Sequence, residues 1–377
     1  MQRTLILMGA LALVGCDAGE RLAPLVPPLV PPWSDSGPLA SRFGAPDAVV
    51  PAGASIQAAV DAAGPNAVIH LSPGVYAQTV TITQPGVKLV GLTDGAGNGA
   101  IIQNPGGAPN GITVRPGANG FALVNVTVRD FDGNGVLLVQ VDGFLLSRVT
   151  ARDNGAYGLF PVRSTNGVIE HSIASGHADA GLYVGQSRGV TMRRNVVYGN
   201  VVGIEASNSS DIKLLANEAY DNTNGILVVL LPGRQIKTAA DILVSGNRVH
   251  DNNRPNFADP EDLVAAVPAG TGILIVGVDR AKAEANTVTG HPFIGLAVAS
   301  TLVLADLSGT PPEAFADIEP NPDGVSVRDN VVTGNGASSP VPFLPPADLL
   351  WDGTGAGNCW SGNTFGTSVP PALPGCE

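Results

Sequence analysis

The chain has 377 residues and a net charge of −12, and only 14% of its residues are charged while 44% are hydrophobic. A surface with this acidic excess repels polyanions, so DNA and RNA are excluded as expected partners. The apolar content is sufficient for one large core. The 48 glycines and 31 prolines predict a strand-rich domain with many turns rather than long helices.

The first fifteen residues predict an export signal. Arg3 precedes an apolar run at 5–14 that is too short to remain as a membrane span. The run ends in LVGC at 13–16, which resembles the lipobox of bacterial lipoproteins. That resemblance implies removal of residues 1–15 and lipidation of Cys16. We therefore expect a protein of the bacterial cell envelope, periplasmic or outer-surface, that contacts the membrane through its lipid.

The segment 16–48 is expected to connect this anchor to the folded domain. It contains the stretch PLVPPLVPPW and shows no apolar period. Proline-rich sequence favours an extended and semi-rigid backbone, so the segment is predicted to be a tether that lifts the domain off the membrane.

The two remaining cysteines, Cys359 and Cys376, lie near the C-terminus. In an exported protein, two such cysteines most simply form a disulfide. We expect this bond to close the end of the domain, where Trp360 and Phe365 would cover the apolar core.

A repeated phrase, glycine followed by an apolar residue, divides most of the chain into units of 22 to 24 residues. It begins at positions 111, 135, 158, 181, 203, 225, 272 and 295, and the one gap of 47 residues equals two units with added residues. A second phrase, NVVYGN at 195–200, recurs as NEAYDN, NRVHDN and NVVTGN. Short strand-like stretches separated by Gly and Asn at this period predict an all-β fold, a right-handed parallel β-helix over residues 49–377.

In such a solenoid, each recurring Asn lies above the Asn of the coil below, and their amides are expected to hydrogen-bond in columns. His171, His177 and His291 replace Asn in the phrase and are expected in the same columns. Ahead of the first coil, Ser55 begins an amphipathic segment that ends at Gly64. This segment predicts a short helix that covers the open end of the stack.

The segment IQAAVDAAGPNAVIHLSPGVY, at 56–76, resembles the N-terminal signature of pectin-lyase-like β-helix proteins. GLYVGQS and DNNRPNFADPEDL further resemble a group of exported parallel β-helix repeat proteins that are often encoded beside a diheme c-type cytochrome. The resemblance covers about residues 50–377. It implies a pectin-lyase-like solenoid and makes an exported redox protein a candidate partner, while the group itself has no established activity.

The residue two places after each repeated glycine is expected to point outward from the solenoid. This outward column is predicted to contain Leu138, Phe160, Tyr183, Glu205, Leu227, Leu274 and Ala297. Glu205 is the charged member of the column, and Tyr183 lies one coil away, about 5 Å along the stack. An acid beside a phenol suits sugar hydroxyls and proton transfer, so Glu205 and Tyr183 are candidate catalytic residues.

Further residues complete the predicted site. His177 and Asp179 precede the coil of Tyr183 and would supply a proton shuttle. Their segment GHAD resembles in part the Asp/His motif of β-helix mannuronan epimerases, although the flanking residues differ. A polar edge, five places after the glycines, is expected to bind ligand beside Phe160; it consists of Gln140, Arg163, Gln186 and Asn208. The structural alternative, a solvated acid beside a surface tyrosine, stays open.

Two functions stay open at this point. In the first, a monomer recognises an extended polysaccharide along its wall, with or without modifying it; as an enzyme it would be a lyase, hydrolase or epimerase. In the second, the protein is a non-enzymatic scaffold or partner of an exported c-type cytochrome system. No metal or cofactor is expected. Calcium at the acidic segments 130–134 or 259–263 is the alternative, although plain loops are favoured there.

Overall fold

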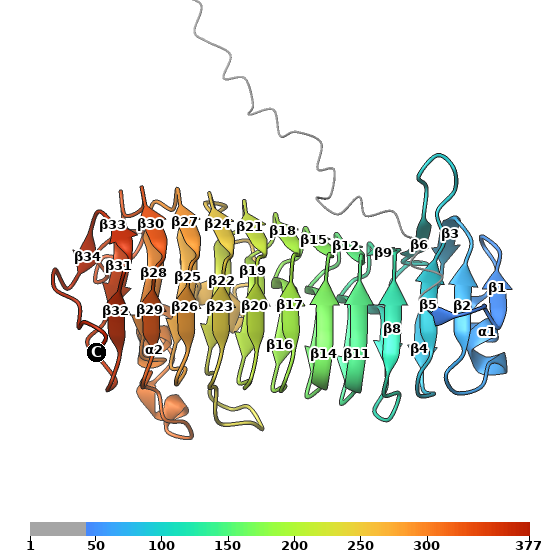
Figure 1. Cartoon of the computed structure of the whole chain (residues 1–377), viewed down its shortest axis with the longest axis horizontal. Coiled ribbons are helices and arrows are strands. Elements are labelled where there is room, and N and C mark those ends of the chain that lie inside the picture. The colour runs from blue at the N-terminus through green and yellow to red at the C-terminus, as the bar shows by residue number, and fades with distance from the viewer. Residues whose placement is uncertain (1–42) are drawn as a thin grey trace, which may run out of the picture. The chain divides into compact units, whose positions relative to one another are not determined.

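The structure, a computed structural model, describes residues 43–377, which form three parallel β-sheets. We call the sheets A, B and C. In each coil the chain passes from sheet C to sheet A, then to sheet B and back to sheet C, and each strand pairs with the strand one coil away (Figure 1). This is a right-handed parallel β-helix, so the predicted fold class is confirmed. The signal segment, Cys16 and the tether up to residue 42 lie outside the described residues.

Sheet A has twelve strands: β1 (Ala48–Val50), β2 (Val68–Leu71), β5 (Lys88–Gly91), β8 (Phe121–Val124), β11 (Asp142–Ser147), β14 (Thr165–Glu170), β17 (Thr191–Arg193), β20 (Lys213–Leu215), β23 (Leu243–Ser245), β26 (Lys282–Glu284), β29 (Ser326–Arg328) and β32 (Cys359–Ser361). Sheet B has eleven: β3 (Gly74–Ala77), β6 (Ala100–Gln103), β9 (Val126–Arg129), β12 (Thr150–Arg152), β15 (Ile173–Ser175), β18 (Val196–Tyr198), β21 (Glu218–Tyr220), β24 (Arg248–His250), β27 (Thr287–Thr289), β30 (Val331–Thr333) and β33 (Thr364–Phe365). Sheet C also has eleven: β4 (Val80–Ile82), β7 (Asn110–Val114), β10 (Asn134–Val139), β13 (Tyr157–Val162), β16 (Ala180–Gly185), β19 (Val202–Ser207), β22 (Asn224–Val229), β25 (Thr271–Val276), β28 (Ile294–Ala299), β31 (Ala347–Trp351) and β34 (Ser368–Val369).

The core consists of columns of like side chains. The apolar residue after each repeated glycine points inward, and in-register pairing places each one against its equivalent in the next coil. The column contains Val136, Leu159, Leu182, Ile204, Ile226, Ile273, Leu296 and, after Asp348 in place of the glycine, Leu349, all with 0% exposure. Burying each of these side chains stabilises the fold by about 1.5–3 kcal/mol, so the apolar half of the repeated phrase holds the coils together.

The repeated glycine is required by the polar column beside it. A Cβ atom on Gly203 would lie 2.5 Å from the carbonyl oxygen of Gly225 and 3.0 Å from the side-chain nitrogen of Asn222. A side chain at this position would therefore push the next coil away. The two repeated phrases depend on each other, because the glycine leaves the space in which the next asparagine lies.

The first polar column follows the turn between sheets A and B. The side-chain amide of each Asn donates to the carboxamide oxygen of the next one at 2.9–3.0 Å, and that oxygen also accepts the backbone N–H of the same donor residue. The members are Asn195, Asn217, Asn247, Asn286, Asn330 and Asn363. Each turn thereby obtains hydrogen-bond partners that a buried backbone otherwise lacks.

The second polar column follows the turn between sheets B and C. It contains Asn154, His177, Asn200, Asn222, Asn252, His291, Asn335 and, at its end, Asp348. His177 and His291 therefore occupy the predicted column. Both replace a carboxamide with a ring that offers two nitrogens along the stack, so the column continues through them.

His171 does not lie in either column, contrary to the prediction. Its place is taken by Ser172, whose backbone N–H donates to the Asn195 side-chain oxygen at 3.0 Å. His171 is the preceding residue and has a φ of 52°, as Arg194 (54°) and Ala216 (51°) do in later coils. The left-handed residue of this turn comes just before the column residue, and the left-handed backbone directs the side chain of His171 outward.

The helix α1 (Ile56–Ala62) covers the first coil as predicted. The Ser55 hydroxyl oxygen accepts a hydrogen bond from the Ala58 N–H at 3.0 Å, and Ile56 is fully buried against the core. The Gln57 side chain accepts the N–H of Thr81, in the edge strand β4, at 2.7 Å. The stack begins slightly before residue 49, because β1 already includes Ala48.

The C-terminal end is closed by the predicted disulfide between Cys359 and Cys376, whose Cα atoms are 4.7 Å apart. Trp360 is 6% exposed and packs on the core, which confirms half of the predicted cover. Phe365 does not contribute, since it is 42% exposed. It pairs with the buried Val332 at the open end of sheet B, where its ring faces solvent.

From β11 onward, long segments leave the solenoid at the two turns that flank sheet C, whereas the loop 92–99 lies earlier in the chain, between β5 of sheet A and β6 of sheet B. The segments at the turns that flank sheet C are the loop 230–242, the segment 251–270 with the 3₁₀ helix η2 (Leu263–Ala266), the segment 300–325 with α2 (Leu302–Ser308) and the 3₁₀ helix η3 (Pro312–Phe315), and the segment 334–346. Figure 1 shows α2 and the loop after β22 projecting along the same long side. Within residues 43–377, no helix is long and apolar enough to cross a bilayer.

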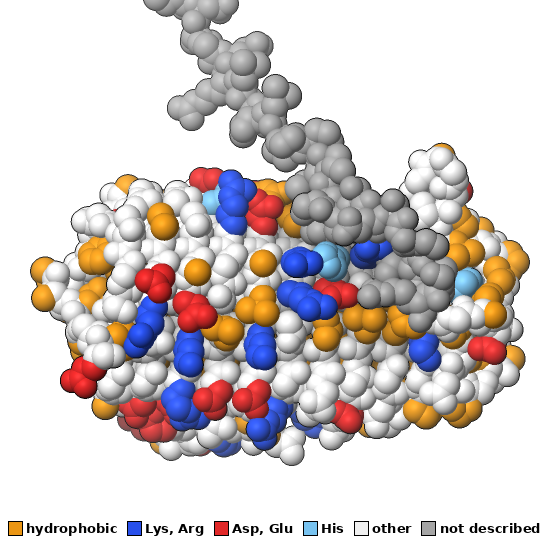
Figure 2. Space-filling view, viewed as in Figure 1, with side chains coloured by type: hydrophobic (Ala, Val, Ile, Leu, Met, Phe, Trp, Pro, Cys, Tyr) orange, Lys and Arg blue, Asp and Glu red, His pale blue; other side chains and the backbone are white. Residues whose placement is uncertain are grey.

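Figure 2 shows a face of the solenoid on which Lys and Arg side chains lie among Asp and Glu side chains. Exposed ion pairs of the described residues include Arg188 with Asp211 at 2.6 Å and Arg280 with Asp241 at 2.8 Å. Exposed pairs contribute little to stability and are typical of a solvated surface.

Replacing Asn217 by Ala should lower the free energy of unfolding by about 3 kcal/mol, because it leaves buried amide groups of two coils without partners. Urea denaturation measures the loss. Asn363→Ala is the matched control, since Asn363 ends the same column, is only half-buried and lies within reach of water. It should cost about 1 kcal/mol. Equal losses would contradict an interior column that stabilises the stack.

Candidate functional site

The outer face of sheet C changes in character along the stack. One outward position is occupied in successive coils by Leu137, Phe160, Tyr183, Glu205, Leu227, Leu274, Ala297 and Leu350. The column passes from aromatic residues to an acid and then to aliphatic residues. Leu138, which was expected here, is fully buried in the core. Leu137 is the residue two places after Gly135, so strand alternation directs Leu137 outward and Leu138 inward.

Glu205 and Tyr183 are buried, which corrects the expectation of an exposed wall. Their relative exposures are 5% and 7%. The segments that leave the solenoid cover them, and Arg234, Asp262 and Leu304 line the same pocket of about 120 Å³. We name this the acidic pocket and define it by Tyr157, Asp179, Tyr183, Glu205, Arg234 and Asp262.

An aromatic cluster forms one side of the acidic pocket. The ring of Tyr183 lies 5.0 Å from that of Tyr157 and 4.8 Å from that of Phe160, edge to face in both pairs. Contacts of this kind contribute about 0.5–1.5 kcal/mol each beyond area burial. The cluster therefore fixes the two phenol groups, and Phe160 contributes packing at the pocket edge.

Asp179 enters the pocket from the turn before β16. Its carboxylate accepts a hydrogen bond from the Tyr157 hydroxyl, while its Oδ1 atom is buried and has no partner among residues 43–377. Glu205 is surrounded by the charges of Asp179 and Arg234 and receives no hydrogen bond from the described part of the chain. Buried polar atoms are normally satisfied, so two acids with unmet hydrogen-bonding capacity require an explanation.

The environment of the two acids separates their protonation states. Burial raises the pKa of the Glu205 carboxyl well above its ordinary value, and the negative charge of Asp179 raises it further, against the opposing charge of Arg234. Burial raises the pKa of Asp179 to about 6, against the hydrogen bond from Tyr157. Glu205 therefore keeps its proton to a higher pH than an ordinary glutamate does, while Asp179 ionises near pH 6. Two carboxyl groups in different states can act as an acid and a base.

The two phenols remain protonated throughout the physiological range. Burial raises the pKa of Tyr157, and the negative charges of Asp179 and Glu205 add to the increase. Burial raises the pKa of Tyr183 as well, together with the charge of Glu205. Both hydroxyl groups are consequently hydrogen-bond donors rather than bases.

His177 does not join the acidic pocket. It is fully buried in the second polar column, where its Nδ1 lies 2.7 Å from the Asn200 side-chain oxygen and its Nε2 lies 3.2 Å from the Asn154 side-chain nitrogen. Burial lowers the pKa of His177 to about 4, so the ring is neutral. Its position fits a column residue and not the proton shuttle that the sequence suggested.

Gln186 and Asn208 hold the loop 230–242 against the solenoid. The Gln186 side-chain oxygen accepts the backbone N–H of Gln235 at 2.9 Å, and the Asn208 side-chain nitrogen donates to the Ile236 carbonyl at 2.8 Å. Asn208 is fully buried, which corrects its expected place on an accessible polar edge. These contacts position the loop that carries Arg234.

Gln140 and Arg163 are exposed at the equivalent turns of earlier coils, with φ values of 52°. The Arg163 Nη1 donates to the Gln235 side-chain oxygen at 3.4 Å. Neither residue lines the acidic pocket. Of the predicted polar edge, these two therefore keep access to solvent beside the open part of the wall.

Three pocket residues were missed from the sequence, namely Tyr157, Arg234 and Asp262. Tyr157 is the residue before Gly158 and lies two places before the inward Leu159, so simple alternation along β13 predicts an inward side chain and could not place it in the pocket. Arg234 and Asp262 belong to the added residues of the 47-residue double unit. Added residues mark a place where the chain leaves the wall, but the direction of their return depends on tertiary contacts.

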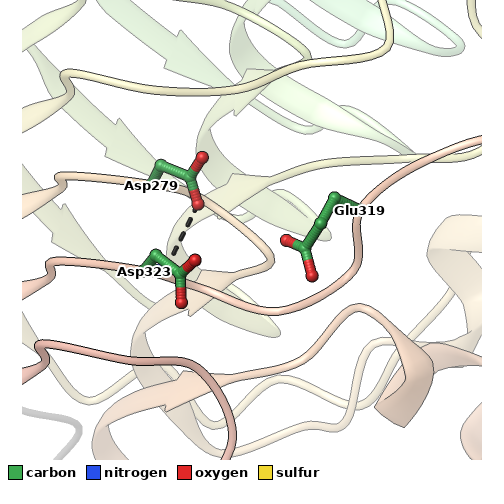
Figure 3. Close-up of side chains that lie close together, drawn as sticks. All are labelled: Asp279, Glu319 and Asp323. Atoms are coloured by element: carbon green, nitrogen blue, oxygen red, sulfur yellow. Dashed lines mark hydrogen bonds between the residues drawn. The ribbon is translucent and has the colours of Figure 1, made fainter.

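Another acidic group lies outside the pocket, where Asp279, Glu319 and Asp323 bring carboxylate oxygens within 4.8 Å of one another (Figure 3). Each accepts a hydrogen bond from a backbone amide: Asp279 from Asp323, Asp323 from Ala356 and Glu319 from Asn321. Stabilisation of adjacent turns accounts for these positions, and we assign no cation to them.

Glu205→Gln should raise the melting temperature at pH 7–8, equivalent to on the order of 1 kcal/mol, because the folded state holds Glu205 protonated while the unfolded chain ionises it. A carboxyl pKa that is raised on folding reduces stability as pH rises above the unfolded value of 4.5. The gain should therefore vanish below that pH. Melting curves from pH 4 to 8 provide the measurement.

Glu170→Gln is the matched control for that substitution. Glu170 is also buried but pairs with Arg193 at 2.5 Å, so its replacement should not stabilise at neutral pH. A destabilised Glu205→Gln variant would show that Glu205 is a structural residue.

Comparisons with known proteins agree with this architecture. Residues 110–232 match a family model described as right-handed beta helix region, and no curated protein matches the sequence. Similar solved structures include the A-modules of the Azotobacter vinelandii mannuronan C-5 epimerases AlgE6 and AlgE4 and the Dettilon tailspike protein gp208.

The likeness to these structures concerns the fold. For AlgE6, the identity is 20% and the TM-score 0.61, covering 87% of this chain and 96% of that module. For AlgE4, the values are 19%, 0.57, 87% and 97%, and for the tailspike 14%, 0.58, 86% and 60%. This chain therefore has the fold of a right-handed parallel β-helix, and residues 110–232 match the model of that region.

Proposed function

We propose that the protein binds a neutral polysaccharide along sheet C and hydrolyses a glycosidic bond in the acidic pocket. The observation that carries this proposal is the pair formed by a buried Glu205, whose pKa is raised well above its ordinary value, and Asp179, whose Oδ1 has no partner among the described residues. Acids that are held in unequal protonation states inside a pocket are characteristic of catalytic sites.

The reaction needs only these two acids and water. Glu205 donates its proton to the leaving glycosidic oxygen, and Asp179 takes a proton from the water that attacks the anomeric carbon. The bond between that carbon and the leaving oxygen breaks as the bond to the water oxygen forms. The proton on Asp179 then returns to Glu205 through solvent, so one water is consumed in each cycle.

The other pocket groups suit a neutral sugar. Tyr183 is a donor for hydroxyl or ring oxygens, while the Tyr157 hydroxyl donates to Asp179 and orients that carboxylate. Asp179 and Asp262 outnumber Arg234, so the carboxylates of a uronate polymer would be repelled. Leu137 and Phe160 on the half-exposed wall before the pocket offer an apolar surface for an extended chain. The likeness to mannuronan C-5 epimerases supports carbohydrate as the ligand class.

Replacement of each acid by its amide tests the proposal. Purified protein is incubated with neutral glucans, mannans and galactans and with alginate, and products are detected by reducing-end assay and mass spectrometry. Glu205→Gln and Asp179→Asn should each lower kcat at least 100-fold on the active polysaccharide. The rate should rise through about pH 6 as Asp179 ionises and fall at higher pH as Glu205 loses its proton.

His177→Asn is the control for these variants, because it keeps a column side chain and should leave kcat unchanged. Full activity of both acid variants would refute the assigned site. Binding without turnover on every polymer would limit the function to recognition. Neither binding nor turnover would favour the alternative of a non-enzymatic scaffold or partner of an exported redox system.

We further propose that the protein is exported and anchored to the envelope through a lipid on Cys16. The disulfide between Cys359 and Cys376 supports an oxidising compartment. Cys16→Ser should move the protein from the membrane pellet to the soluble fraction after cell lysis, as detected by immunoblot. An unchanged pellet fraction would contradict anchoring at Cys16.

A further inference from the structure

A second, apolar pocket of about 50 Å³ lies on the outer face of sheet C, under α2. We name it the apolar pocket and define it by Leu274, Ile294, Ala297, Leu304, Leu307 and Leu350. Two polar residues, Thr271 and Asp352, also line it, but both side chains are hydrogen-bonded to neighbouring protein groups. A ligand group therefore meets an apolar lining.

The two pockets are adjacent. Leu227, Val267 and Leu304 line both of them. Leu227 is also the register partner of Glu205, so the apolar pocket begins one coil beyond the acid, about 5 Å along the stack. A group bonded to a sugar in the acidic pocket has only to pass Leu227 to enter the apolar pocket.

A small residue in the outward column leaves this space. Leu227, Leu274 and Leu350 project from their coils, but Ala297 stands between the last two. A leucine there would fill the volume that α2 encloses. Lining atoms that face a void lose dispersion contacts, and an apolar cavity of this kind stays dry and accepts apolar molecules.

We propose that the apolar pocket receives a short apolar substituent, such as an acyl or alkyl group of about two or three carbon atoms, carried by the sugar in the acidic pocket. This inference rests on the proposed function and deepens it. The substrate class becomes a neutral polysaccharide decorated with short esters or ethers. Each CH₂ that enters the pocket should improve affinity about fourfold.

Pairs of alkyl glycosides test this proposal. Methyl, n-propyl and n-hexyl glycosides of glucose, mannose and galactose are titrated by calorimetry against the intact protein. For at least one sugar, the propyl form should bind about 15-fold more tightly than the methyl form, and the hexyl form should gain no more because the pocket is full. Equal affinities for every sugar, including no detectable binding of either form, overturn the proposal.

Ala297→Leu should abolish the preference for propyl, while its melting temperature stays at or above that of the parent. If the Ala297→Leu variant does not fold, Ala297→Val is measured in its place. Leu145→Ala, on the outer face of sheet A and outside both pockets, should keep the preference. A preference that persists in the folded Ala297→Leu variant overturns the proposal.

Glu205→Gln separates this inference from the proposed function. It should reduce turnover while leaving the propyl-to-methyl affinity ratio unchanged, because it alters only the acidic pocket. If the parent protein prefers propyl over methyl glycosides but shows no turnover, hydrolysis is refuted while the apolar pocket is not. Turnover that depends on Glu205, combined with a ratio of one, would refute the apolar pocket but not hydrolysis.

Discussion

Hydrogen bonding between stacked asparagines imposes one geometric condition on every coil. The amide of Asn195 reaches Asn217 only if both turns lie at the same point of the solenoid cross-section, and Asn217 imposes the same condition on Asn247. The turn between sheets A and B accordingly contains two residues in every coil from β11 to β32. Partners buried at this depth are costly to lose, so this corner of the molecule tolerates no inserted chain.

From β11 onward, insertions are therefore confined to the turns that flank sheet C. The second column residue, such as Asn252, comes early in its turn, so added residues follow it without breaking the column. All the long segments consequently emerge beside one sheet and fold over its outer face. The result is a rigid wall that positions Tyr183 and Glu205, combined with loops that supply Arg234 and Asp262, a division of labour that is common in binding sites.

The parts of the molecule that follow from local spacing could be predicted from the sequence. The period, the end helix, the disulfide and the proximity of Tyr183 to Glu205 all depend on residues within a coil or its neighbour. Two predicted positions were wrong for identifiable reasons. Leu138 was placed one position too far along its strand, and His171 is the left-handed residue that precedes the column residue. The loops could not be derived, because their paths depend on contacts such as that between Gln186 and Gln235, 49 positions apart.

A stack of parallel coils has no natural end, since each terminal coil offers unpaired backbone groups to any similar coil that approaches. In this protein, the side-chain oxygen of Gln57 in α1 accepts the backbone N–H of Thr81 at one end. At the other end, the disulfide between Cys359 and Cys376 holds a loop against the last coil. Both devices fix the number of coils by blocking addition rather than by completing a shape. These two features therefore oppose the end-to-end addition of a second solenoid.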